Sequence, residues 1–248
     1  MSDERHRLRV RFTKAGRIRF VSHRDVARLF ERALRKLRLP VAYSEGFSPR
    51  PKLSFGLALS VGHESEAEYL DVELTQLPEI EGLAPSLTAA LPDGVTVESV
   101  VELSRGVVSL QQAISSCTWR IEVVGASTAR VTAAAAEVLA APELTFERVR
   151  KGKSVVADVR PSILALRVVG PTTDGTELEA ELSTESTTLR PSELVQVLGR
   201  VTDGSDPTEG LAEGWVRRTH QWIIADGIRS EPVSRPDASA RHEMRRAS

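Results

Sequence analysis

The order of the predicted elements constrains the fold most strongly, because the series strand, helix, strand, strand, helix, strand occurs twice along the 248 residues. In the first half, two alternating segments separated by a glycine turn predict a strand pair at 8–12 and 17–21. The strongest helical pattern follows over 22–39, with Ser22 as N-cap and Pro40 as its stop. Further strands are expected at 41–44, 53–60, 67–75 and 95–103, and a second helix at 79–91.

The second half repeats the series with different residues. Strands are expected at 118–125, 145–150, 154–160, 163–170, 177–183 and 215–224, and helices at 127–141 and 190–201. We therefore expect an α+β protein made of two tandem ferredoxin-like βαββαβ sandwiches with antiparallel sheets. The expected domains are a basic one at 1–104 and a second at 117–228, followed by a disordered tail at 229–248.

Charge is distributed unevenly between the start of the chain and the rest. Residues 1–52 hold 15 Lys/Arg against 5 Asp/Glu, a formal charge of +10, and the remaining residues hold 18 against 29, a formal charge of −11. A basic block at the start of a folded domain indicates a polyanionic partner, most often nucleic acid, because cations near phosphates release condensed counterions. This expectation requires that the cations have no acidic neighbours in the folded chain.

Composition excludes several classes of protein. The chain has no run of 18 apolar residues, and its first residues lack the apolar core of a signal peptide, so we expect a cytoplasmic protein without a membrane partner. Cys117 is the only cysteine, which excludes intramolecular disulfides and self-contained cysteine-ligated iron–sulfur or zinc sites. The five histidines have no ligand-like spacing, so we expect neither a metal nor a cofactor.

Four arginines of the predicted helix form the first candidate binding surface. At about 100° per residue they lie opposite the apolar positions of the helix. They are Arg24, Arg28, Arg32 and Arg35. A solvated polar face is the alternative interpretation, but acids normally alternate with arginines on such a face, and only Asp25 and Glu31 are available here. Contact with phosphates is therefore favoured.

The loop at 44–52 is the second candidate surface. Pro49 and Pro51 restrict the backbone on both sides of Arg50, which preorders a cation for phosphate binding. Phe47 either stacks on an unpaired base or packs in the core beneath a rigid connector. The basic surface is expected to extend to Lys52 and to arginines that alternate outward on the predicted strand pair, namely Arg9, Arg11, Arg17 and Arg19.

Further cations surround a predicted turn in the second half of the chain. They are Arg148, Arg150, Lys151, Lys153 and Arg160. Cationic hairpin tips are commonly only solvated. A second phosphate contact there would use Lys151 and Lys153.

No motif of a hydrolase, a nucleotide-binding loop or a metal-dependent protease is present. His23 and Asp25, in the first turn of the predicted helix, are the only candidates for general acid–base catalysis, although a histidine just after an N-cap is usually structural. Whether the chain is an enzyme stays open, and a non-catalytic role is favoured.

One long segment resembles a known family, the radical-SAM-linked domain family DUF2344. The resemblance is carried by RFTKAGRIRFVSHRDVARLFERALRKLRLPVAYSEGFSPRPKLSFGLALSVGHESEAEYLDVEL and, in the second half, by KGKSVVADVRPSI and STESTTLRPSELV. It implies no assigned activity. Members of the family often occur fused to, or encoded beside, a radical-SAM protein, and near ribonuclease and ribosome-assembly genes. The resemblance therefore implies a standalone accessory protein in RNA or ribosome metabolism.

Three functions are compatible with these observations. The favoured one is a non-catalytic module that binds RNA or a ribosomal particle through the arginine face and the loop. The second is an adaptor that presents substrate to a radical-SAM partner enzyme. The third is an RNA-processing or RNA-modifying enzyme that uses His23 and Asp25.

Overall fold

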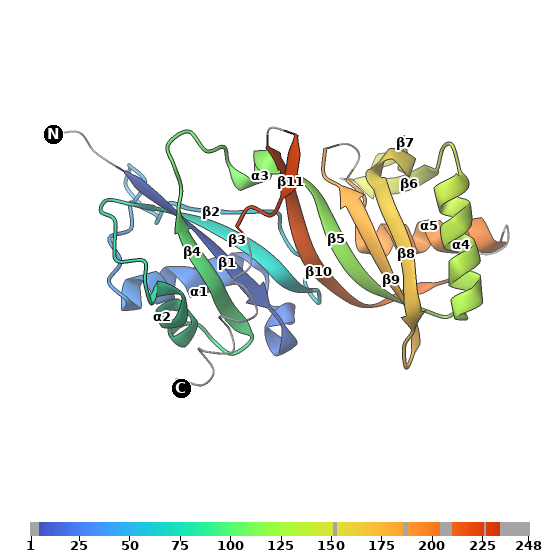
Figure 1. Cartoon of the computed structure of the whole chain (residues 1–248), viewed down its shortest axis with the longest axis horizontal. Helices are drawn as coiled ribbons and strands as arrows, with labels where there is room; N and C mark the ends of the chain where they lie inside the picture. Colours follow the sequence, from blue (N-terminus) through green and yellow to red (C-terminus); the bar gives the residue numbers. More distant parts are fainter. Residues whose placement is uncertain (1–4, 151–152, 186–187, 204–209, 226, 234–248) are drawn as a thin grey trace. The chain divides into compact units, whose positions relative to one another are not determined.

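The chain folds into two compact units in a computed structural model, which describes residues 5–150, 153–185, 188–203, 210–225 and 227–233 (Figure 1). The first unit comprises Met1–Ile114 and Ile223–Ser248, and the second comprises Ser115–Trp222. Both combine helices with mostly antiparallel strands, so the protein is a mixed α+β protein as predicted.

The first unit contains the elements that the sequence predicted, with two exceptions. Its main elements are β1 (His6–Lys14), α1 (His23–Lys36), β2 (Leu53–Phe55), β3 (Glu64–Leu74), α2 (Leu83–Ala90) and β4 (Val95–Glu102). The strands pair in the order β4-β1-β3-β2, and these three pairings are antiparallel. The first exception is the second strand of the expected pair, because Gly16–Phe20 forms a 3-10 helix instead. The second is the expected strand at 41–44, where Val41 and Tyr43 form only isolated bridges.

The start and the end of α1 follow from its sequence. The side chain of Ser22 accepts a hydrogen bond from the backbone N–H of Asp25, as an N-cap does. After Lys36, the N–H groups of Arg38 and Leu39 bond back to the carbonyls of Arg35 and Leu34, with Arg38 at φ 53°. This is a Schellman ending with arginine at the left-handed position that glycine usually occupies.

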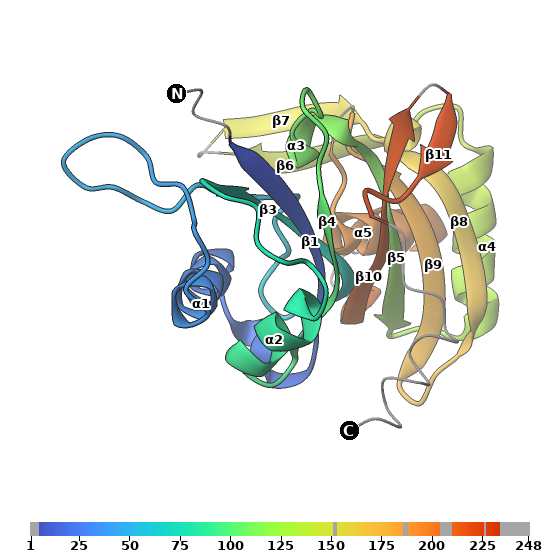
Figure 2. The ribbon, with the colours of Figure 1, turned by 60° about the vertical axis from the view of Figure 1, so that its left-hand side comes forward.

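One apolar core holds α1 and α2 against the sheet of this unit. It joins Val10 and Leu70 on the strands to Phe30 of α1 and Leu87 of α2, all of which are buried. Phe12 adds a tilted aromatic contact with Phe30, with ring centroids 4.7 Å apart. Because apolar residues occupy the face of α1 that packs on the sheet, its arginines are left on the opposite, exposed face. Figure 2 shows α1 and α2 beside the strands of this unit.

The other face of the same sheet is charged and still buried, which corrects one expectation. Arg9 and Arg11 were expected to alternate outward, but they are only 2% and 0% exposed. Arg9 donates two hydrogen bonds, of 2.7 and 2.9 Å, to the carboxylate of Asp71. Lys14 is also buried and donates to two backbone carbonyls. These three cations of the basic block stabilise the fold and are not available to a partner.

Arg11 holds Glu231 and Val233 against this face of the sheet. Its Nη1 lies 2.8 Å from a carboxylate oxygen of Glu231 and donates to the carbonyl of Val233 at 2.9 Å, while Nε donates to Glu98. Burial alone would lower the pKa of Arg11, but Tyr69, Glu231 and Glu98 together raise that pKa above its ordinary value. Of the residues expected in the tail, 229–233 have defined positions, and Ile228–Ser230 forms strand β11. The rest of the expected tail, 234–248, lies outside the described residues.

The second unit repeats the strand order of the first around an inserted hairpin. Its elements are β5 (Ile114–Val124), α4 (Thr128–Ala140), β6 (Thr145–Arg150), β7 (Lys153–Asp158), β8 (Ile163–Pro171), β9 (Gly175–Ser183), α5 (Pro191–Asp203) and β10 (Ala212–Ala225). The sheet runs β10-β5-β9-β8, and β6 pairs only with β7 in a separate hairpin among the described strands. The sequence predicted these elements but not the separation of the hairpin.

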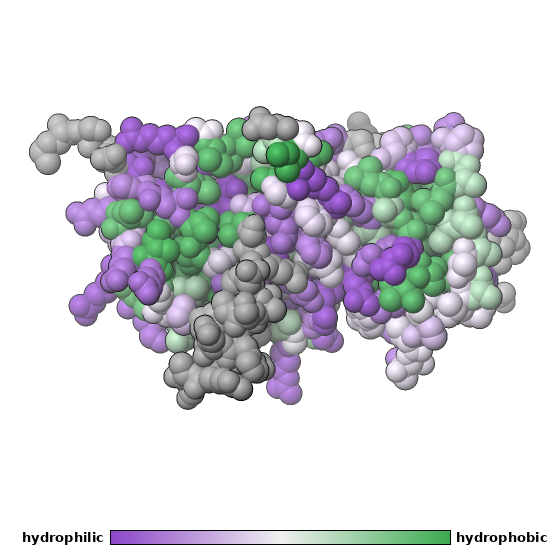
Figure 3. Space-filling model, in the orientation of Figure 1, coloured by the Kyte–Doolittle hydropathy of each residue, from purple (hydrophilic) through white to green (hydrophobic). Residues whose placement is uncertain are grey.

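The second unit has its own core and its own surface features. Ile121 and Leu178 from the sheet and Val138 and Leu198 from the helices are completely buried. Hydrophobic residues also gather on the surface over β8 and α4 (Figure 3).

None of the helices in the described part of the chain has the length and the apolar composition that a membrane span needs.

Candidate nucleic-acid interface

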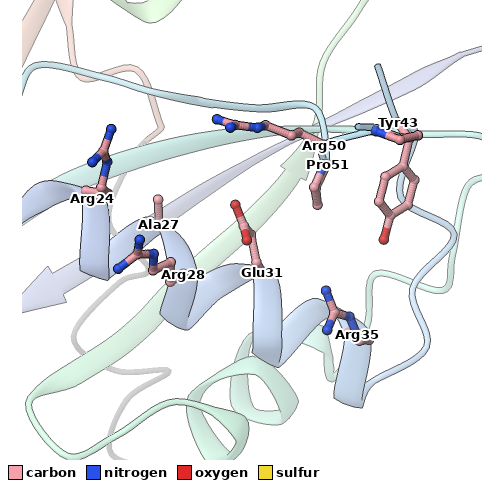
Figure 4. Close-up of a pocket in the computed structure, with 9 residues that line it drawn as sticks. Arg24, Ala27, Arg28, Glu31, Arg35, Tyr43, Arg50 and Pro51 are labelled. Carbon is pink, nitrogen blue, oxygen red and sulfur yellow. The ribbon is translucent and has the colours of Figure 1, made fainter. Parts of the chain in front are cut away.

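The arginine face of α1 and the loop that follows it line a groove of about 580 Å³ in the first unit (Figure 4). The helix contributes Arg24, Ala27, Arg28, Glu31 and Arg35. The loop side contributes Tyr43, Pro49, Arg50 and Pro51. Four of the nine lining residues are arginines and one is acidic, so the groove is basic.

The helical side of the groove follows from residue spacing. Steps of four, three and four residues separate Arg24, Arg28, Glu31 and Arg35, so the four side chains share one face of α1. All three arginines are exposed, whereas Glu31 is partly buried. The helix therefore presents a row of guanidinium groups that is interrupted by one carboxylate.

The loop side is held by hydrogen bonds at its base. The N–H of Ser44 donates to the carbonyl of Arg50 at 2.9 Å, and the N–H of Arg50 donates to the hydroxyl of Ser44 at 3.0 Å. Lys52 then pairs with Ala42 through the backbone, and Gly46 turns the chain at φ 115°. These bonds fix the backbone of Arg50, whose guanidinium extends over α1 (Figure 4).

The start of α1 carries an ion pair beside the groove. Arg28 donates to the carboxylate of Asp25 at 2.9 Å, and the hydroxyl of Ser22 donates to the same carboxylate at 2.7 Å. The hydrogen bond from Ser22, followed by Arg28 and by the charge of Arg24, lowers the pKa of Asp25. The carboxylate of Asp25 therefore partly neutralises the charge of Arg28.

The remaining arginines of this surface have no such neighbour. No carboxylate of the described residues lies within salt-bridge distance of Arg32, Arg35 or Arg50. All three side chains are exposed. A helix surface with cations that are not matched by acids has unused capacity for an anion.

The groove unites only part of the predicted nucleic-acid-binding set. Arg24, Arg28, Arg35 and Arg50 line it, and Arg32 is exposed on α1 outside the lining. The other predicted residues of the first unit also lie outside the lining. Arg17 is exposed on the 3-10 helix, Arg19 lies 3.5 Å from Glu64 and over the ring of Phe20, and Lys52 lies 3.2 Å from Glu73.

Phe47 is exposed, which excludes its alternative position in the core. The accessible surface of this residue is 110% of its reference value, so Phe47 is fully exposed, and this is the highest value among the exposed large hydrophobic residues described. The outer part of the loop that carries it extends away from α1 and the sheet of its unit, whereas the end of the loop, at 49–51, lines the groove (Figure 2). An aromatic ring in this position gains no stability for the fold and is available for stacking on a partner.

The second predicted basic cluster is largely structural where it is described. Arg148 is buried and donates to the carbonyl of Thr188 at 2.7 Å. Arg160 donates to the carbonyls of Ile163 and Leu139, the latter near the end of α4. Lys151 lies outside the described residues, and of Lys153 only the backbone is described, at the start of β7.

The two catalytic candidates do not line the groove. His23 packs edge-on against Phe55, with ring centroids 5.0 Å apart, and Asp25 is engaged by Ser22 and Arg28. In the described part of the chain, no three His, Cys, Asp or Glu side chains are grouped as ligands for a metal would be.

Two lining residues were missed by the sequence analysis. Glu31 was considered only as a possible ion-pair partner, although its spacing from Arg28 and Arg35 already placed it in their row. Tyr43 precedes the loop and forms an isolated bridge with Pro51, which brings its ring to the groove. The spacing along the helix could have identified Glu31, but no local signal identified Tyr43.

An α+β protein with a basic groove is thus the class that the fold and the site define. The chain belongs to the family described as "Uncharacterized protein conserved in bacteria (DUF2344)", whose profile matches residues 7–191. The match contains the whole of α1 and the loop that follows it. No curated protein matches the chain.

Several solved structures have a partly similar backbone. A Cbf5–Nop10–Gar1 complex matches with a TM-score of 0.49 and 9% identity over 86% of this chain and 48% of that chain. An archaeal box H/ACA sRNP Nop10–Cbf5 complex gives a TM-score of 0.45 and 9% identity over 86% and 47%. An H/ACA RNP bound to a substrate RNA containing 2′-deoxyuridine gives 0.44 and 8% over 87% and 47%. This chain spans about half the length of those chains, and likeness at this level carries no function to it.

Proposed function

We propose that this protein is a non-catalytic RNA-binding module of RNA or ribosome metabolism, which acts in the cytoplasm and contacts phosphates through the groove between α1 and the loop at 44–52. The observation that carries the proposal is the set of four arginines that line one groove, of which Arg35 and Arg50 have no carboxylate within salt-bridge distance among the described residues. A phosphodiester backbone supplies anions at regular spacing along such a row.

The exposed Phe47 supports RNA with unpaired bases as the ligand. Proteins that bind single strands combine a positively charged groove with aromatic side chains on which bases stack. Phe47 is on the same loop as Arg50, three residues before it, and its ring is exposed. A strand held at Arg50 by a phosphate therefore has an aromatic ring within reach of its bases.

The strand orders support a finer description of the fold. Along the chain, each unit is a strand–helix–strand–strand–helix–strand series, if the β6–β7 hairpin is regarded as an insertion. Across each sheet, the strands of that series lie in the order fourth, first, third, second. We propose on this basis that the chain consists of two tandem ferredoxin-like units. In the first unit, the helix face rather than the sheet face is then the binding surface, because Arg9 and Arg11 on the sheet are buried.

A titration of the protein with labelled single-stranded RNA over a range of salt concentrations tests the proposed function. Each phosphate contact contributes a slope of about −0.7 to the dependence of log K on log salt, so the four arginines predict a slope of about −3. Replacing Arg24 and Arg35 together by glutamate is expected to reduce the affinity by more than about tenfold and to flatten the slope by about 1.4.

The control is Arg167→Glu, which makes the charge change of one of these two substitutions at an exposed arginine on β8 of the second unit, and it is compared with the single variants Arg24→Glu and Arg35→Glu. It is expected to leave both affinity and slope nearly unchanged. A flat salt dependence, or equal effects of the single groove variants and the control, would contradict the proposal. Recovery of a radical-SAM protein by this chain after nuclease treatment, without RNA binding, would favour the adaptor function instead.

A further inference from the structure

Glu31 is the one acidic residue among those that line the groove, and its position calls for an explanation. Its carboxylate points from α1 into the groove, toward the loop segment that carries Arg50 and Pro51 (Figure 4). The other charged lining residues are Arg24, Arg28, Arg35 and Arg50. A carboxylate in this position repels any phosphate that the arginines attract.

Glu31 is not used as an ion-pair partner by its neighbours. Arg28 and Arg35 lie three residues before it and four residues after it, the two spacings at which side chains meet on a helix. Nevertheless, no Lys or Arg of the described residues lies within 4.0 Å of its carboxylate, whereas Arg28 pairs with Asp25. The acceptor atoms of Glu31 are therefore available to a ligand that enters the groove.

A ligand with a hydroxyl donor would convert this repulsion into an attraction. A carboxylate only accepts hydrogen bonds, and a bond from a hydroxyl to a carboxylate is among the stronger ones in proteins. In a nucleic acid strand, the ribose 2′-hydroxyl is a donor beside the phosphates, and DNA lacks it.

The spacing along α1 suits such a contact. With a rise of about 1.5 Å per residue, Glu31 lies roughly 4.5 Å along the helix axis from Arg28 and 6 Å from Arg35. Arg28 and Arg35 are thus roughly 10.5 Å apart along the axis, so a strand whose phosphates reach these two flexible side chains has at least one sugar between them, near Glu31. The acid thus lies where a sugar would be, between positions where phosphates would be.

We infer that Glu31 accepts a hydrogen bond from a ribose 2′-hydroxyl and makes the groove select RNA over DNA. This inference rests on the proposed function, since it assumes that a phosphodiester strand occupies the groove. RNA would gain a hydrogen bond to the carboxylate of Glu31. DNA would meet only the repulsion between this carboxylate and its phosphates, because it has no 2′-hydroxyl to offset it.

Fluorescence titrations with a single-stranded RNA and the DNA of the same sequence test the inference. The natural protein is expected to bind the RNA about tenfold more tightly, a ratio typical of one hydrogen bond to a charged group. Glu31→Ala is expected to weaken RNA binding, to strengthen DNA binding, and to bring the ratio close to one. Glu31→Gln, which keeps an acceptor oxygen without the charge, is expected to retain part of the preference.

Glu45→Ala is the matched control, because Glu45 is exposed on the loop at 44–52 and is not among the residues that line the groove. It removes the same charge and is expected to strengthen RNA and DNA binding by the same small factor. Melting curves by circular dichroism confirm that each variant is folded. If Glu31→Ala also strengthens RNA and DNA equally, Glu31 only repels phosphates and the inference is overturned.

The outcomes separate the inference from the proposed function. A natural protein that binds RNA and DNA equally, with a steep salt dependence, overturns the selection by Glu31 and leaves the basic groove intact. A natural protein that binds neither strand overturns both.

Discussion

Strand β1 and helix α1 both carry arginines, and the folded protein treats the two sets in opposite ways. On β1, Arg9 and Arg11 are buried and paired with carboxylates. On α1, Arg32 and Arg35 are exposed and lie beyond salt-bridge distance of any carboxylate in the described residues. The same residue type therefore has a structural role in one element and is available for binding in the other.

The difference arises from what faces each element. In the sheet register, Arg9 lies directly opposite Asp71 and Arg11 opposite Tyr69, so the neighbouring strand supplies a partner for each. The outer face of α1 is approached instead by Tyr43 and the loop at 44–52, which line the groove with it and bring no carboxylate to the lining. The charge of a segment thus indicates a binding surface only for the side chains that no neighbouring element neutralises.

Removal of a buried arginine is the strongest test of this comparison. Arg9→Ala removes both hydrogen bonds to the buried carboxylate of Asp71 and leaves it, among the described residues, only Arg7, whose Nε is 4.0 Å away, so the free energy of unfolding is expected to fall by an amount at the lower end of about 3–5 kcal/mol. Urea unfolding measures the loss. Arg32→Ala on the exposed face is the control and is expected to change stability by less than about 0.5 kcal/mol. Similar losses for the two variants would remove the distinction between the two sets of arginines.

Removal of the exposed aromatic ring sharpens the binding side of the comparison. Phe47→Ala is expected to weaken binding of single-stranded RNA by about 1–3 kcal/mol, because one stacked base loses its platform. It should leave the melting temperature unchanged, since the ring is fully exposed. Titrations with single-stranded and duplex RNA measure the effect, and an equal loss for both would show that Phe47 does not contact unpaired bases.

The smallest expected effect concerns the start of α1, which positions the arginine row. Ser22→Ala removes the N-cap and is expected to lower the free energy of unfolding by about 1 kcal/mol. The same change removes the largest cause of the lowered Asp25 pKa, so that pKa should rise toward its ordinary value, as measured by NMR titration of the carboxyl carbon. An unchanged pKa would assign the shift to Arg28 instead.

The sign of the pH dependence follows from the lowered pKa. Because Asp25 binds its proton less readily in the folded chain than in the unfolded chain, its contribution to stability is present above the unfolded pKa. The contribution is lost as the pH falls through the folded value. In Ser22→Ala, the part of the acid destabilisation that belongs to this site should become smaller.

The sequence predicted local features well and long-range pairings poorly. Ser22, the apolar spacing of α1 and the arginines opposite it are local signals, and they predicted the helix and its exposed face. The pairing of Arg9 with Asp71 joins residues 62 positions apart, so alternation along β1 alone gave no indication of a charged buried face. The 3-10 helix at Gly16–Phe20 was missed because its alternating residues also fit a strand.

The same limit applies to the groove. The prolines around Arg50 indicated an ordered loop, but its approach to α1, and hence the inclusion of Tyr43, depends on hydrogen bonds that close the loop at Ser44. In the second unit, the element order was predictable, while the separation of the β6–β7 hairpin from the sheet depends on pairing that single strands do not reveal.

Photocrosslinking of the intact protein to a single-stranded RNA that carries a photoreactive uridine, followed by mass spectrometry, tests the central claim most directly. We expect crosslinked peptides from α1 and from the segment 43–52, which contains Tyr43 and Phe47, and their loss when Arg24 and Arg35 are changed to glutamate. Crosslinks confined to the second unit, or unaffected by that change, would contradict the assignment of the groove as the RNA-binding surface.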